Sequence, residues 1–202
     1  MIHGIEYVQG TFVRGAKGLA KGLLCSPIAY GAGWIVAKLL QEPTRAWGWS
    51  GVASAVSRFV LEEVINELAE IKGRESATKK SLLSLRFMTS DLAFMAVLAS
   101  LSSLTPMGAI WCGGGVVSNA LAAIGYGLAS KDIISLSTAK KVEMSLACVA
   151  MLVNLTAMAA FGLLNSPLMM GGAIVLGSLL LLALAQQLRS IRRENQPMLE
   201  GV

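Results

Sequence analysis

The sequence predicts an all-α, polytopic membrane protein with four transmembrane helices in two hairpins, preceded by amphipathic helices. Two observations predict this class. The chain is 54% hydrophobic and 14% charged, whereas soluble domains carry about a quarter charged residues. In addition, every charged residue lies outside two windows, 92–130 and 144–188, which are 39 and 45 residues long. Since one bilayer crossing needs about 20 apolar residues, each window can hold two crossings.

The first uncharged window must contain a turn to form two helices. Ser102–Pro106 is the favoured position because its serines, threonine and proline are turn-forming residues. Gly113–Gly115 is the alternative. With the favoured turn, the two helices cover about 85–104 and 107–129, and the first needs several residues upstream of the window to reach crossing length.

The second window divides at Asn165-Ser166-Pro167, a turn signal between two 21-residue apolar stretches. These stretches, 144–164 and 168–188, complete a predicted bundle over residues 81–188. A polar tail, 189–202, follows.

Basic residues flank the bundle unevenly. Neither hairpin turn contains a charge, whereas all three outer flanks are basic, and loops rich in lysine and arginine stay on the cytoplasmic side. Both termini and the middle loop are therefore expected on the cytoplasm-equivalent side of a bacterial inner membrane or an equivalent organelle membrane. The flanking residues are Lys79, Lys80, Arg86, Lys131, Lys140, Lys141, Arg189, Arg192 and Arg193.

The N-terminal segment, residues 1–45, combines a basic amphipathic helix with a shorter apolar stretch. Arg14, Lys17 and Lys21 share one helical face and are expected to contact anionic lipid headgroups. Gly22–Ala37 is uncharged for 16 residues, which is slightly short for a crossing. A crossing there would also place the three cations across the membrane from the other basic flanks, so a shallow or re-entrant placement with irregular backbone around Pro27 is favoured.

Residues 46–80 are expected to form a second amphipathic helix, about 47–72, followed by a solvated linker. Its apolar residues follow a helical period, and its glutamates take mostly the opposite face. The helix is expected on the cytoplasmic side, against the bundle or a partner. Its expected partner-binding face consists of Val56, Phe59, Val60 and Val64.

Four polar residues could form an intramembrane ion or proton site. Asp91 is the acid closest to an apolar crossing, with Arg86 as a possible partner, and Asn119 and Asn154 fall inside the uncharged windows. Ionisable groups at membrane depth suggest function. The alternatives are that Asp91 caps a helix at the interface and that the asparagines hydrogen-bond between helices.

Small residues recur at a spacing of four. Such ridges allow helices to approach closely and favour a compact bundle or a homo-oligomer. The ridges are Gly114, Ser118 and Ala122 in the first window, and Ala173 and Gly177 in the second.

The sequence contains no catalytic, metal-binding or nucleotide-binding motif, so neither an enzyme nor a cofactor is expected. Cys25, Cys112 and Cys148 are scattered and indicate reduced, buried thiols. His3 is the only histidine and has no ligand cluster near it. The basic residues are not interleaved with aromatics, so no nucleic-acid surface is expected.

Two functions fit these features. The favoured one is a non-enzymatic integral membrane subunit or scaffold that anchors a membrane-protein partner. The alternative is a homo-oligomeric pore, a holin-like protein or a small transporter, with the polar residues above lining its path.

Overall fold

All regular elements of the computed structural model are helices, which confirms the all-α class. The structure describes residues 2–72, 76–165 and 167–195. The elements are α1 (Ile2–Leu40), α2 (Thr44–Lys72), α3 (Ser76–Ser100), α4 (Pro106–Ala129), α5 (Leu136–Ala160), the short 3-10 helix η1 (Leu163–Asn165) and α6 (Pro167–Asn195).

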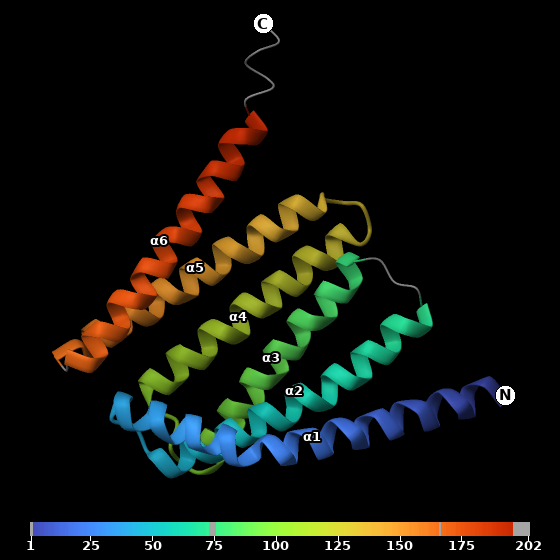
Figure 1. The fold of residues 1–202 in the computed structure, drawn as a ribbon, viewed down its shortest axis with the longest axis horizontal. Coiled ribbons are helices and arrows are strands. Elements are labelled where there is room, and N and C mark those ends of the chain that lie inside the picture. The colour runs from blue at the N-terminus through green and yellow to red at the C-terminus, as the bar shows by residue number, and fades with distance from the viewer. Residues whose placement is uncertain (1, 73–75, 166, 196–202) are drawn as a thin grey trace, which may run out of the picture.

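The six long helices follow one another in chain order, and each packs mainly on its neighbours in sequence. Figure 1 shows them as an open fan in which neighbouring helices run in opposite directions. The start of α1, the end of α2, the start of α3 and the α4–α5 link lie at one end of the fan (Figure 1). The α1–α2, α3–α4 and α5–α6 turns lie at the other end (Figure 1).

Four of the described helical stretches are long and apolar enough to cross a membrane. Their surfaces are also apolar: Leu24 and Ile28 are 80% and 76% exposed. Water penalises such exposure, whereas lipid does not. These findings support a helical membrane protein. The four stretches are Gly10–Leu40, Ala77–Ser100, Pro106–Ala129 and Leu136–Ala160, and α6 contains a shorter apolar stretch, Ala173–Gln186.

Helix α1 is continuous, so the irregular backbone expected around Pro27 is not found. A proline inside a helix removes one hydrogen bond and favours a bend. The ribbon changes direction in its lighter blue half (Figure 1). Next to Pro27, the Ser26 hydroxyl donates to the Gly22 carbonyl over 3.0 Å. With α2 packed along its length, α1 tolerates the proline without breaking.

Glycines bring α1 and α2 into backbone contact. A Cβ atom on Gly18 would lie 2.6 Å from the Phe59 carbonyl oxygen, and one on Gly22 would lie 2.7 Å from the Val56 Cα. On the other side of the contact, a Cβ on Gly51 would lie 2.6 Å from the Ala29 carbonyl oxygen. Small residues at four-residue spacing permit such close packing. Helix α2 therefore lies lengthwise between α1 and α3.

The first uncharged window turns between Ser100 and Pro106, and Gly113–Gly115 lies inside α4. Thr105 caps α4 by accepting a hydrogen bond from the Gly108 N–H at 3.1 Å. Its hydroxyl also donates to Glu42 Oε1 over 2.7 Å, which ties this turn to the α1–α2 turn.

Two helices begin earlier than their apolar stretches. Helix α3 starts at Ser76, so the linker predicted over 73–80 is wrong for Ser76–Lys80, and residues 73–75 lie outside the described part. Helix α5 starts at Leu136, where Ser135 caps it by accepting from the Thr138 N–H. Polar first turns extend a helix beyond the bilayer because water or caps satisfy their ends. Of the predicted tail, residues 189–195 continue α6, and 196–202 are outside the described residues.

The main apolar core lies at the end of the fan that holds the α1–α2 and α3–α4 turns. Trp47 is 2% exposed, and its ring makes an edge contact with Phe94 at a centroid distance of 5.3 Å. The core residues are Ala37, Leu40, Ala46, Trp47, Leu98, Met107, Ala157, Met158 and Leu163.

The α1–α2 contact can be tested with two alanine substitutions. Gly22→Ala should destabilise the protein by about 1–3 kcal/mol, because its methyl group overlaps the Val56 backbone. Gly31→Ala is the matched control, since a Cβ there has no neighbour within 4 Å and alanine favours a helix by about 1 kcal/mol. Thermal unfolding in detergent micelles should show a lower midpoint for the first variant only; equal midpoints would contradict the contact.

Candidate functional site

A cavity of about 500 Å³ lies among α1, α2, α3 and α4. Four ionisable side chains line it: Arg58 and Glu62 from α2, and Arg86 and Asp91 from α3. Its remaining lining is largely apolar and includes aromatic rings. We refer to it as the polar cavity.

Helical spacing presents these polar groups to the same space. Ser54, Arg58 and Glu62 are four residues apart on α2 and therefore share one face. On α3, Arg86 and Ser90 have the same spacing, and Asp91 follows directly. The two stripes face each other because α2 packs against α3.

Arg58 is joined to α3 by a pair of serine hydroxyls. Its Nε donates to Ser90 Oγ over 2.9 Å, and the Ser90 and Ser54 hydroxyls are 2.6 Å apart. Ser90 is fully buried, whereas Ser54 is half-buried and Arg58 is exposed. The Arg58 guanidinium carbon also lies 5.0 Å from the ring centre of Phe87, within cation–π range.

Arg86 pairs with Glu62 and not with Asp91, the partner considered from the sequence. Its Nη1 lies 2.8 Å from Glu62 Oε2, and its guanidinium carbon lies 4.6 Å from the Phe87 ring centre. The ion pair joins α3 to α2, and the ring contact lies within α3. Arg86 Nε is buried and has no hydrogen-bond partner. This cation is therefore largely desolvated, and Glu62 is its ion-pair partner.

Asp91 instead interacts with Asn119 of α4. Asn119 Nδ2 lies 3.4 Å from Asp91 Oδ2 and also donates to the Gly115 carbonyl over 2.9 Å. A Cβ atom on Gly115 would lie 3.1 Å from the Asp91 Cγ, so glycine leaves the room that the carboxylate occupies. Since α3 begins at Ser76, Asp91 lies in the helix interior, and the helix-cap interpretation is wrong.

Asn154 lies apart from the polar cavity. It lines a pocket of about 240 Å³ between α4 and α5, with Trp111, Met151 and Met158 among its neighbours. Its Oδ1 is buried and has no hydrogen-bond partner. The structure thus places Arg86 and Asp91 around the polar cavity and Asn119 against Asp91, but Asn154 in another pocket.

The basic residues of α1 acquire a partner on α2. Lys21 donates a hydrogen bond to Glu63 Oε1, and Lys17 Nζ lies 3.6 Å from Glu63 Oε2. The two lysine side chains remain 46% and 61% exposed, so they can still reach headgroups. Contact of Arg14, Lys17 and Lys21 with anionic lipid stays a prediction.

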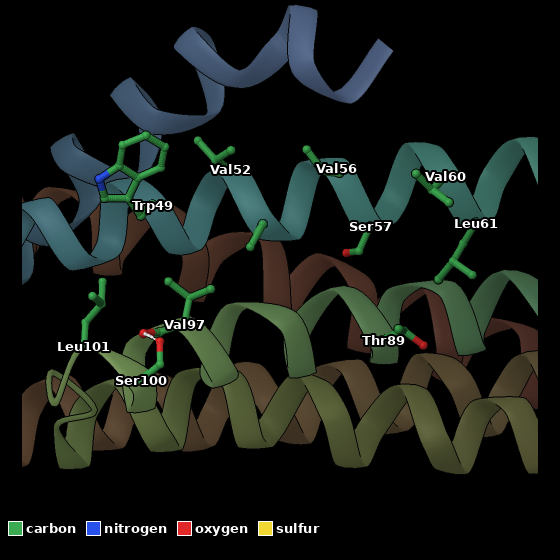
Figure 2. Close-up of a pocket in the computed structure, with 11 residues that line it drawn as sticks. Trp49, Val52, Val56, Ser57, Val60, Leu61, Thr89, Val97, Ser100 and Leu101 are labelled. Carbon is green, nitrogen blue, oxygen red and sulfur yellow. Dashed lines mark hydrogen bonds between the residues drawn. The ribbon is translucent and has the colours of Figure 1, made fainter. Parts of the chain in front are cut away.

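The four residues predicted as one partner-binding face divide between different surroundings. Val56 and Val60 line an apolar groove of about 680 Å³ between α2 and α3. Figure 2 shows this groove, with Trp49 and Val52 on the α2 side and Val97 on α3. Phe59 lines the polar cavity, and Val64 is half-buried on α2.

The small-residue ridge on α4 faces α5. A Cβ on Gly114 would lie 3.9 Å from the Ala150 Cβ, and Ser118 shares a cavity of about 350 Å³ with Gly114 and Ala150. Ala122 is 3% exposed. On α6, Ala173 is half-buried, and Gly177 would place a Cβ in open space. The first ridge therefore serves packing between neighbouring helices.

Sequence reasoning missed Ser54, Arg58, Glu62 and Ser90 as site residues. The spacing of Arg58 and Glu62 equally fits a solvated ion pair on one helix, and a serine such as Ser90 equally fits a helix cap. The four-residue stripe on α2 was the available signal, but it required knowing that α2 is covered by α1 and α3.

Comparison with protein-family models, with curated proteins and with solved structures finds no match for this chain. Among the described residues, no three histidine, cysteine, aspartate or glutamate side chains gather as metal ligands.

The Glu62–Arg86 pair can be tested through its unequal burial. The side chains are 44% and 13% exposed, so removing the glutamate leaves a largely buried cation unpaired. Glu62→Gln should destabilise the protein by about 1–2 kcal/mol, a value reduced by the solvent access of Glu62. Arg86→Met removes the buried charge and keeps an apolar stem on Phe87, so this variant should lose less stability than Glu62→Gln. Thermal unfolding in detergent measures both, and a larger loss for Arg86→Met would contradict the assigned roles.

Proposed function

We propose that this protein is a non-enzymatic small transporter or pore whose path passes through the polar cavity. The observation that carries the proposal is the presence of two arginines, one glutamate and one aspartate in a cavity bordered by helices of membrane-crossing length. Ionisable side chains at membrane depth are costly and usually mark ion or solute pathways. A bundle that served only as an anchor would gain nothing from them.

The proposal requires that α2 lies at membrane depth. Helix α2 has 29 residues, about 44 Å, which exceeds the hydrocarbon thickness of about 30 Å. It packs lengthwise between α1 and α3, both of which contain a stretch able to cross. Arg58 and Glu62 face the polar cavity and Glu63 pairs with the α1 lysines, which lowers the cost of immersing these three charges.

The distribution of basic residues supports a crossing by every long helix. With α1 alone inserted, its cations would face away from the other basic flanks. If α2 and α6 also cross, the chain crosses the membrane six times. The α1 cations and the other basic flanks then all lie on the same side, the cytoplasm-equivalent one. Lys38 and Arg45 are the described basic residues at the opposite end of the fan. The group on the first side comprises Arg14, Lys17, Lys21, Lys79, Lys80, Lys131, Lys140, Lys141 and Arg189.

A second candidate function is the membrane subunit or scaffold. The apolar groove of Figure 2 favours it, because Trp49, Val56 and Val60 could receive a helix of another membrane protein. Purification in mild detergent with a stoichiometric second protein, together with an absence of transport in vesicles, would favour this function over the pore or transporter.

The crossing of α2 can be tested by labelling engineered cysteines from one side of a sealed membrane. In a chain whose native cysteines are replaced by alanine, Gln41→Cys and Leu104→Cys should react with a membrane-impermeant maleimide from one side. Lys79→Cys and Lys131→Cys should react only from the other side. Labelling of Gln41→Cys and Lys79→Cys from the same side would show that α2 does not cross.

Transport can be tested in vesicles loaded with a pH-sensitive dye. Vesicles that contain the protein should lose an imposed pH gradient faster than empty vesicles. Asp91→Asn should slow this loss about tenfold, because it removes the carboxylate from the path. Asn154→Leu is the matched control, since Asn154 lies in a separate pocket, and its rate should stay near that of the unmodified protein.

Two results would contradict the transport proposal. One is a gradient that decays equally in protein-containing and empty vesicles. The other is equal slowing by Asp91→Asn and Asn154→Leu, which would point to a general loss of structure.

A further inference from the structure

The charges of the polar cavity are balanced. Two guanidinium groups, from Arg58 and Arg86, share the space with two carboxylates, from Glu62 and Asp91. A cavity that selects anions or cations needs an excess of the opposite charge, since like charges disfavour binding. The balance therefore favours a ligand that carries both signs.

Three aromatic side chains of the cavity gather at one end. Trp47, Phe94 and Trp111 lie where α2 and α4 begin and α3 approaches its end, which is the end of the fan with the apolar core. The charged side chains come later in α2 and earlier in α3, together with the Phe59 and Phe87 rings. A ligand that fills the cavity would need a charged head and an apolar body.

Among the charged groups, Arg58 and Asp91 are best placed to meet a ligand. Arg58 is exposed, and its hydrogen bond to Ser90 engages Nε, which leaves the Nη1–Nη2 edge for a carboxylate. The long contact of Asp91 with Asn119, at 3.4 Å, engages Oδ2 only. Arg86 and Glu62 already form a direct ion pair.

We propose that the polar cavity binds a zwitterionic amphiphile of the α-amino-acid class with an apolar side chain. Its carboxylate pairs with Arg58, its ammonium group pairs with Asp91, and its side chain packs on Trp47, Phe94 and Trp111. The cavity volume of about 500 Å³ falls within the range of small-molecule sites. This inference rests on the proposed function and names the solute class of that site.

Three matched probes test the requirement for both charges. All three probes carry the same apolar body. L-Phenylalanine adds both charges, 3-phenylpropanoate adds only the negative charge, and 2-phenylethylamine adds only the positive charge. Titration calorimetry on the full chain in phosphatidylcholine nanodiscs should show phenylalanine binding at least about tenfold more tightly than either analogue. Equal or tighter binding of one analogue, or no binding of phenylalanine, would overturn the proposal.

Two substitutions should change the selectivity in opposite senses. Asp91→Asn should remove the advantage of phenylalanine over 3-phenylpropanoate, because the group that repels a lone carboxylate and holds the ammonium is gone. Arg58→Gln should remove its advantage over 2-phenylethylamine. Asn154→Leu, outside the cavity, should leave all three affinities unchanged. Partial unfolding would weaken the binding of all three probes by the same factor. Equal losses of affinity for all three probes in both variants would therefore overturn the assignment.

The binding and vesicle experiments separate this inference from the proposed function. Gradient loss that depends on Asp91, without preferential phenylalanine binding, would retain the transport function and overturn the zwitterion assignment. Preferential phenylalanine binding in vesicles that neither lose their gradient nor take up radiolabelled phenylalanine would retain the binding site and overturn transport.

Discussion

The architecture depends on the backbone contact between α1 and α2. Gly18, Gly22 and Gly51 have no side chains at the points where the two helices touch, so the helices can run together over most of their length. This contact holds a helix that carries arginine and glutamate within a layer whose other members are mostly apolar. With bulkier residues at these points, α2 would stand away from α1, and the polar cavity would lose one wall.

Around this contact, polar and apolar surfaces divide the two sides of α2. One side presents Ser54, Arg58 and Glu62 to the polar cavity, and another presents Val52, Val56 and Val60 to the groove between α2 and α3. The charged side chains gather in the space between α1, α3 and α4, and the valines line the apolar groove. In a bilayer this is the arrangement with the lower free energy, because lipid solvates valine but not a guanidinium.

The sequence was sufficient for the class of the protein and for the turn at Ser102–Pro106, because uncharged runs and turn residues are local signals. It was not sufficient for α2, whose glutamates match a solvated face equally well. Nor could it assign a partner to Asp91, since Asn119 and Arg86 are both possible until the packing of α3 against α4 is known. Within α1 alone, glycines only weaken the helix, because their benefit comes from the contact with α2.

The packing of each helix on its sequence neighbours has a consequence for biogenesis. Helices α1 and α2 pack mainly on each other and on α3, so they can associate before α5 and α6 are synthesised. The α1 to α4 segment that encloses the polar cavity is also complete at Ala129. The chain can therefore assemble in the order of its synthesis, and the low sequence separation of its contacts favours rapid folding.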